Sequence, residues 1–144
     1  MYFKNILVPF DGSKYSRRAF EKAVELAKNN DTKIKILTCI SAGHGTDMAF
    51  ETKFTDMDEK RQEKAALAEI AKMTSIAKKS GIPASGAVVK TISIPNKIIS
   101  FAKSQKSDLI VMGSHGRTGF LKIVIGSVAN YVLSKSPCPV LVVK

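Results

Sequence analysis

The chain has 144 residues, 44% of them hydrophobic, which is enough to bury one core and predicts a single domain over residues 1–144. No apolar stretch approaches the roughly eighteen residues that cross a bilayer, so we expect a soluble cytoplasmic protein with no membrane segment. The net charge is +11, and from Met73 onward ten Lys or Arg face a single acid, Asp108. This imbalance favours an anionic partner, which is either nucleotide phosphate, nucleic acid or another protein.

The two cysteines, Cys39 and Cys138, each lie alone inside an apolar run. They lack the paired spacing of a zinc site or of a redox dithiol. The sequence therefore favours two buried structural thiols.

The first half of the chain predicts two strands and two helices. Residues 3–9 form a short apolar run that is typical of a buried strand, and residues 13–30 carry small apolar side chains at helical spacing. Residues 33–40 predict a second strand. A polar loop over residues 41–54 then leads into the longest predicted helix, residues 55–80, which Gly81 and Pro83 end.

The second half continues the same alternation. Strands are predicted at residues 87–91, 108–112 and 139–143, and helices at residues 95–104 and 127–135. The run Asp-Leu-Ile-Val-Met at 108–112 is apolar after its first residue, as expected for a strand covered on both faces. The alternation predicts an α/β fold, a three-layer α/β/α sandwich around a five-stranded parallel sheet.

The clearest functional motif follows the fourth predicted strand. Gly113-Ser114-His115-Gly116 is separated by nine residues from Gly126-Ser127, at the start of a predicted helix. Glycine lets the backbone approach a bulky anion, and a helix N-terminus offers unpaired amides to phosphate, to which Ser127 can add its hydroxyl. The alternative is an ordinary loop in which Ser127 only caps a helix.

The spacing G-x2-G-x9-G-S resembles the ATP-binding signature of the universal stress protein family. The resemblance covers nearly the whole chain, from Val8-Pro9-Phe10-Asp11-Gly12-Ser13 to the ending at residues 137–143. It implies the Rossmann-like sheet order 3-2-1-4-5, homodimers formed through the last strand at residues 139–143, and ATP or another adenine nucleotide with Mg²⁺ or Mn²⁺. Ser93 departs from the family pattern, which often has glycine there.

The strand order can also be argued from the motif itself. In an open parallel sheet, ligands bind at the carboxyl ends of the strands where the winding reverses. If strands 1 and 4 are neighbours, this crevice lies between Asp11 and Gly113. The order 2-1-3-4-5 would place the reversal near Thr91 and Ser93, away from the glycine loop.

The resemblance also assigns residues to the nucleotide. Asp11 meets the ribose or helps to hold the metal, although it also suits an Asp-Gly turn or a helix cap. Pro9, Ile40 and Met112 lie beside the nucleoside, with the backbone of Ile40 offered to adenine; Ile40 and Met112 fit equally well as core residues.

The remaining candidates surround the phosphates. They are Gly113, Ser114, His115, Gly116, Arg117, Gly126, Ser127 and Val128. His115 is expected to act through its backbone, since His44 offers no partner for a metal site. Arg117 and Lys122 either neutralise phosphate or are solvated loop charges.

These features favour a binding module over an enzyme. The sequence has no G-x4-G-K-[ST] loop and offers no clear residue to activate water, so no catalytic residue is assigned and we expect ATP hydrolysis to be slow at most. The role expected from the resemblance is a nucleotide-dependent regulatory or stress-response module, with an unidentified regulatory protein as a further partner. Two alternatives are a basic nucleic-acid-binding protein, which the absence of Trp and of a basic aromatic strand disfavours, and a dimeric adaptor with a structural nucleotide.

Overall fold

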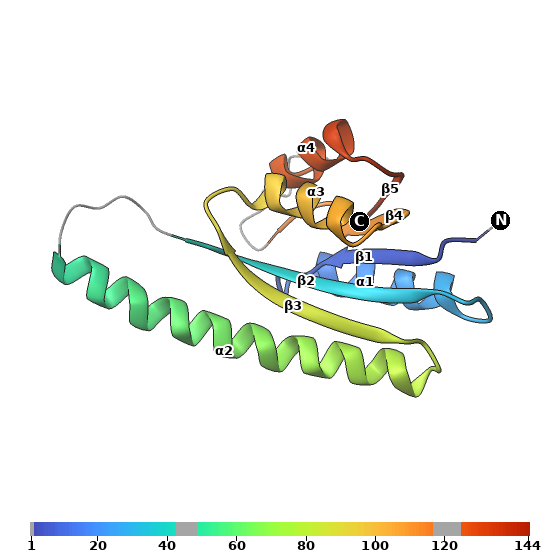
Figure 1. Ribbon diagram of the computed structural model, residues 1–144, viewed down its shortest axis with the longest axis horizontal. Coiled ribbons are helices and arrows are strands. Elements are labelled where there is room, and N and C mark those ends of the chain that lie inside the picture. Colours follow the sequence, from blue (N-terminus) through green and yellow to red (C-terminus); the bar gives the residue numbers. More distant parts are fainter. Residues whose placement is uncertain (1, 43–48, 117–124) are drawn as a thin grey trace.

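The computed structural model describes residues 2–42, 49–116 and 125–144. Strands and helices alternate along these residues, as the sequence predicts (Figure 1). The elements are β1 (Asn5–Pro9), α1 (Lys14–Ala27), β2 (Lys33–Ser41), α2 (Ala49–Lys79), β3 (Ala84–Thr91), α3 (Ile94–Ser104), β4 (Leu109–Gly113), α4 (Ser127–Lys135) and β5 (Val140–Val143).

The five strands form one parallel sheet in the order β3-β2-β1-β4-β5, which confirms the predicted fold class and strand order. β1 lies in the middle, where Ile6 pairs with Ile34 of β2 on one side and with Leu109 of β4 on the other. The direction of winding reverses between β1 and β4. The carboxyl ends of these two strands therefore open the crevice in which ligands of such sheets bind.

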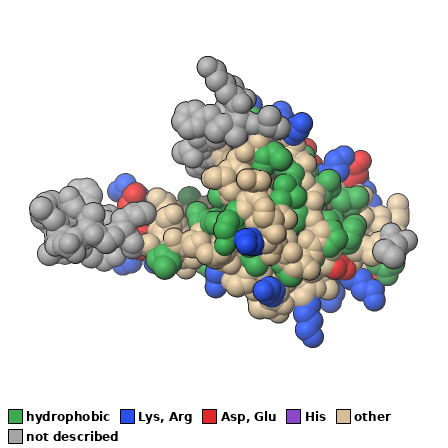
Figure 2. All heavy atoms as spheres, turned by 90° about the horizontal axis from the view of Figure 1, so that it is seen from above, with side chains coloured by type: hydrophobic (Ala, Val, Ile, Leu, Met, Phe, Trp, Pro, Cys, Tyr) green, Lys and Arg blue, Asp and Glu red, His purple; other side chains and the backbone are tan. Residues whose placement is uncertain are grey.

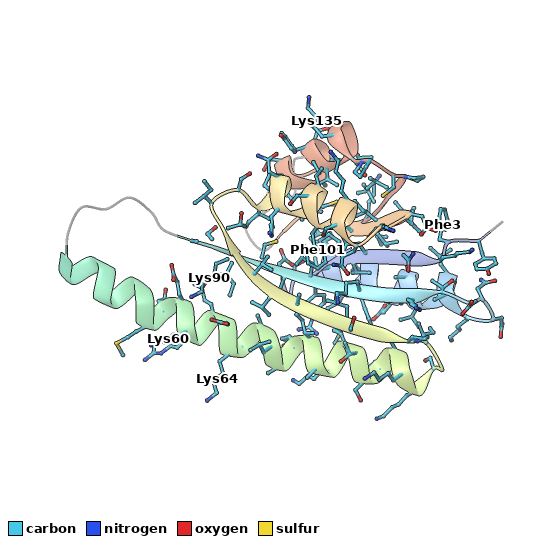
Figure 3. All side chains as sticks on the ribbon, in the orientation of Figure 1. Phe3, Lys60, Lys64, Lys90, Phe101 and Lys135 are labelled. Atoms are coloured by element: carbon cyan, nitrogen blue, oxygen red, sulfur yellow. The ribbon has the colours of Figure 1, made fainter. Side chains whose placement is uncertain are left out.

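Two helices cover each face of the sheet, and each face has its own hydrophobic core (Figure 1). On one face, small and aromatic side chains of α1, such as Ala19 and Phe20, pack with Ile70 and Met73 of α2 against β1, β2 and β4. On the other face, α3 and α4 pack against the sheet, and Phe101 of α3 lies between its helix and the strands (Figure 3). None of the helices in the described residues has the length and hydropathy needed to span a membrane.

The predicted loop over residues 41–54 is too long, because the backbone is already helical from Ala49. Residues 49–54 contain no Gly or Pro that would prevent a helix, but they also lack a regular apolar stripe, so periodicity does not detect the helix there. The helix ends at Lys79, and Gly81 follows with a φ of 77°, a left-handed conformation that suits glycine.

Salt bridges also connect α2 to the edge strand β3. The ammonium of Lys90 lies 3.6 Å from a carboxylate oxygen of Glu59 and 3.8 Å from one of Glu63, and Figure 3 shows Lys90 beside the helix. Lys60 and Lys64 on the same helix point away into solvent. β3 begins at Ala84, three residues earlier than predicted, because Ala84 already pairs with Ile34 of β2.

Candidate functional site

A cavity of about 590 Å³ opens at the carboxyl ends of the central strands, between the sheet and the helices α3 and α4. Its volume lies within the range of small-molecule sites. The side chains and backbone that line it come from β1, β2, β4 and the segments around them: Pro9, Phe10, Asp11, Ser16, Leu37, Cys39, Ile94, Ile98, Met112, Gly113, Ser114, His115, Gly116, Gly126, Ser127, Val128 and Ala129. The sequence predicts ten of these residues.

The first glycine corner is formed by close packing of β4 against the start of α1. A Cβ added at Gly113 would lie 2.7 Å from Cβ of Tyr15 and 3.0 Å from the backbone N of Ser16. A methyl group does not fit at these distances. Gly113 therefore allows α1 to approach the end of β4, a structural reason for glycine that the phosphate-binding interpretation does not include.

The second glycine corner is joined to the first by a hydrogen bond. The N–H of Gly126 donates to the carbonyl oxygen of Ser114 at 2.6 Å, and the N–H of Ser114 donates to the carbonyl oxygen of Val143 in β5 at 2.8 Å. These two amides are therefore engaged within the protein. The amides at the start of α4 are better placed to bind an anion.

The two helices that begin beside the cavity are capped differently. At α1, the hydroxyl oxygen of Ser13 accepts a hydrogen bond from the N–H of Ser16 at 3.1 Å. At α4, the N-cap is Gly126, which has no side chain, and no side chain caps the helix. The first-turn N–H groups from Ser127 to Ala129 have no intrahelical acceptor, and they lie in the wall of the cavity. An anion in the cavity would cap this helix.

Asp11 follows β1 and lies at the mouth of the same cavity. One of its carboxylate oxygens, Oδ1, accepts a hydrogen bond from the N–H of Ser13 at 2.9 Å, and Gly12 between them has a φ of 82°. This is the Asp-Gly turn that the sequence offers as an alternative role for Asp11. The turn does not remove Asp11 from the site, because its exposed side chain also lines the cavity and Oδ2 would lie 3.0 Å from a Cβ added at Gly116.

The inner end of the cavity is apolar. Leu37, Ile98, Met112 and Ala129 belong to the core between the sheet and the helices α3 and α4, so the cavity is an opening into that core. An apolar wall of this kind suits the flat face of a nucleobase.

On β2, Cys39 lines the cavity and the neighbouring Ile40 does not. Successive side chains of a strand point to opposite faces, so only one of the two can face α3 and α4. Ile40 is buried within the protein, which leaves its predicted backbone role untested. The interpretation of Cys39 as a buried structural thiol is incomplete, since this half-buried side chain lies in the cavity wall. Leu37 and Cys39 are two residues apart and therefore lie on the same face of the strand. This spacing could have identified Cys39 as a lining residue.

His115 turns its ring toward α1. Its Nδ1 lies 2.9 Å from the hydroxyl oxygen of Ser114, and its ring centroid lies 5.2 Å from that of Tyr15. Arg117 and Lys122 lie outside the described residues. Within the described residues, no three His, Cys, Asp or Glu side chains come together to hold a metal ion.

The position of Cys39 in the cavity wall lowers the expected rate of alkylation of its thiol. Burial raises the pKa of this thiol to about 11, and the positive charge of Lys97 on α3 offsets part of that rise. At pH 8, only about one molecule in a thousand then carries the reactive thiolate. We expect slow alkylation of Cys39 by iodoacetamide, with a rate that rises about tenfold per pH unit between pH 7 and 10.

Mass spectrometry of the labelled peptides measures this rate directly. A ligand in the cavity should slow the labelling of Cys39 further, whereas Cys138, which does not line the cavity, provides an internal control. Labelling of Cys39 at the rate of an unfolded-chain thiol at neutral pH would contradict the burial of this side chain.

Comparison with known proteins places this geometry in a family. The model of the universal stress protein family matches residues 2–144. A universal stress protein of Methanocaldococcus jannaschii is 33% identical over 144 residues, which cover 99% of this chain and 82% of the relative.

Solved structures share the fold. The universal stress protein UspA from Lactobacillus plantarum superposes with a TM-score of 0.90 at 23% identity, over 100% of this chain and 99% of the other. A universal stress protein in complex with cAMP has a TM-score of 0.72 at 22% identity, covering 99% and 98% of the two chains. One from Archaeoglobus fulgidus in complex with dAMP has a TM-score of 0.67 at 23% identity, with both chains covered completely. The match over residues 2–144 and the 33% identical relative show that the chain belongs to the universal stress protein family.

Proposed function

We propose that this protein binds an adenine nucleotide, with ATP as its ligand in the cell, in the cavity between β1, β4 and the start of α4. The observation that carries the proposal is the uncapped N-terminus of α4, which opens into the cavity beside the glycine loop. A phosphate group at this position would accept hydrogen bonds from the first-turn amides and from the Ser127 hydroxyl. The Gly126–Ser114 hydrogen bond fixes the geometry of this corner before any ligand arrives.

The apolar end of the cavity supports adenine as the base. The side chains of Leu37, Ile98 and Met112 offer apolar contact to the base, and the Cys39 thiol beside them is neutral at physiological pH. Two family members of the same fold have been solved with cAMP and with dAMP, which are both adenine nucleotides. The chemistry of the wall and these two complexes point to the same ligand class.

A divalent cation fits as a companion of the phosphates. The donor set of the described residues does not form a protein cage for a metal, but Asp11 places one carboxylate at the mouth of the cavity. Mg²⁺ in nucleotide sites is commonly held by one or two carboxylates together with the phosphates. Asp11 would hold Mg²⁺ or Mn²⁺, and the ion would neutralise phosphate charge.

The role we propose is regulatory. Asp11 is the only carboxylate that lines the described cavity, and its Oδ1 already accepts the Ser13 N–H. It is therefore poorly suited to activate water, and we expect turnover of ATP below about one per second, the low end of enzyme rates. A colorimetric phosphate assay measures this turnover.

We also propose that the protein is a homodimer that pairs through β5. This strand lies at one edge of the sheet, and Leu141 is 38% exposed on it. Figure 2 views the molecule from the side of α3 and α4, where hydrophobic side chains lie at the surface between Lys or Arg side chains. An unpaired apolar edge strand offers its backbone to a second copy. Light scattering at several concentrations tests the dimer.

Isothermal titration calorimetry with ATP and with GTP tests the proposed ligand. We expect a dissociation constant for ATP in the micromolar range or below, and binding of GTP at least about tenfold weaker, because guanine would place polar groups against the apolar wall. The alternative that the protein binds nucleic acid would instead predict affinity for an oligonucleotide that collapses with added salt.

A further inference from the structure

The described lining of the cavity contains no positive side chain to bind a polyphosphate. Among its described lining residues, Asp11 is the only one with a full charge, and that charge is negative. The α4 amides can bind one phosphate group. The further phosphates of a triphosphate add negative charge, which the carboxylate of Asp11 would repel. Cations must therefore come from outside the described lining.

The first turns of α1 carry two cations that both lie over the Tyr15 ring. The ammonium of Lys14 lies 5.2 Å and the guanidinium carbon of Arg18 lies 5.8 Å from the centroid of the Tyr15 ring. Both cations are exposed, and neither forms a salt bridge with another residue in the described parts of the chain. Arg17 between them is different, because it pairs with Glu69 at 3.4 Å.

Tyr15 connects these cations to the wall of the cavity. Its ring lies 5.2 Å from the ring of His115, which lines the cavity, and its Cβ would lie 2.7 Å from a Cβ at Gly113. The residue that follows, Ser16, also lines the cavity. The aromatic ring thus contacts both cations by cation–π attraction and His115 of the cavity wall by its own ring.

We propose that Lys14 and Arg18 bind the outer phosphates of the nucleotide and give the site its preference for a triphosphate over a monophosphate. This inference rests on the proposed nucleotide function. A flexible ammonium and a planar guanidinium can both leave the Tyr15 ring to form charge-assisted hydrogen bonds with phosphate oxygens. Lys14 and Arg18 do not contact the first phosphate, which the α4 amides bind. They therefore add no affinity for a monophosphate.

The test compares ATP and AMP by calorimetry on the full chain, in EDTA so that no added metal ion neutralises the phosphates. The unaltered protein should bind ATP about tenfold or more tightly than AMP. In the variant Lys14→Gln/Arg18→Gln, the affinity for ATP should fall by about tenfold, and the affinity for AMP should stay within about threefold.

A control removes two charges further from the site, Lys22 within α1 and Lys28 at its C-cap. Lys22 and Lys28 are exposed and lie about 12 and 21 Å beyond Lys14 along the helix axis. The variant Lys22→Gln/Lys28→Gln should keep the full preference for ATP.

The outcomes separate the two proposals. Equal affinity of the unaltered chain for ATP and AMP, or a full preference retained in Lys14→Gln/Arg18→Gln, would overturn the role of these cations and leave the nucleotide site standing. An equal loss in the control variant would overturn it too, since the effect would then be general. Binding of neither nucleotide by the unaltered chain would remove the proposed function and this inference with it.

Discussion

Replacement of Gly113 by valine is expected to destabilise the whole protein and to abolish nucleotide binding. The added Cβ would lie 2.7 Å from Cβ of Tyr15 and 2.8 Å from its carbonyl carbon, and the backbone of a helix cannot yield locally at such distances. We expect the free energy of unfolding to fall by about 3 kcal/mol, at the upper end of overpacking effects. Urea denaturation followed by circular dichroism measures the loss.

The control for this variant is Gly126→Ala. A Cβ at Gly126 would meet the carbonyl oxygen of Ser114 at 3.1 Å, and the backbone there has a φ of −67°, which alanine adopts freely. Its unfolding free energy should fall by about 1 kcal/mol or less. If Gly113→Val lost nucleotide binding with unchanged stability, the close packing of α1 on β4 would not be the reason for the glycine.

Replacement of Cys39 by phenylalanine should weaken nucleotide binding strongly and leave the fold nearly intact. The side chain points into the cavity from β2, so the larger ring has space to enter without displacing the core. It would occupy the apolar end of the cavity, where we place the base. We expect the affinity for ATP to fall by about a hundredfold, or 2.7 kcal/mol, with a change in unfolding free energy below about 1.5 kcal/mol.

Cys39→Ala is the matched control for this prediction. It removes the thiol and slightly enlarges the cavity, so ATP affinity should stay within about threefold of that of the unaltered protein. Calorimetry on both variants separates a steric role of position 39 from a chemical one. Unchanged ATP binding in Cys39→Phe would place the base somewhere other than this wall.

The sequence predicts most of the fold because its elements repeat a simple alternation. The order of the strands follows from the glycine loop after β4, which needs the reversal of winding between β1 and β4. The start of α2 at Ala49 could not be predicted from the sequence. Residues 49–54 contain no Gly or Pro, but they also show no clear apolar stripe that would indicate a helix. The loop over residues 41–54 is predicted from the polar and glycine residues of this segment.

The candidate site is predicted in part for a similar reason. Spacing and turn chemistry predict Gly113, Gly116, Gly126 and Ser127, and the family resemblance adds Asp11; all five line the cavity. The sequence does not show which of two adjacent apolar residues faces a ligand, because a strand buried on both faces has no alternation of polar and apolar residues. The position of Cys39 in the wall, and the Tyr15 ring between two cations, emerge only when the strands and α1 are placed in space.

Titration of ¹⁵N-labelled protein with ATP, followed by amide chemical shifts, tests the central proposal most directly. We expect the largest shifts at the amides of His115 and Gly116 and of Ser127, Val128 and Ala129 at the start of α4, because these residues line the cavity. Amides of α2 near Ala71 and Lys78, at the far side of the sheet, should not move. No shift at saturating ATP, or shifts confined to α2, would contradict a nucleotide site between β1, β4 and α4.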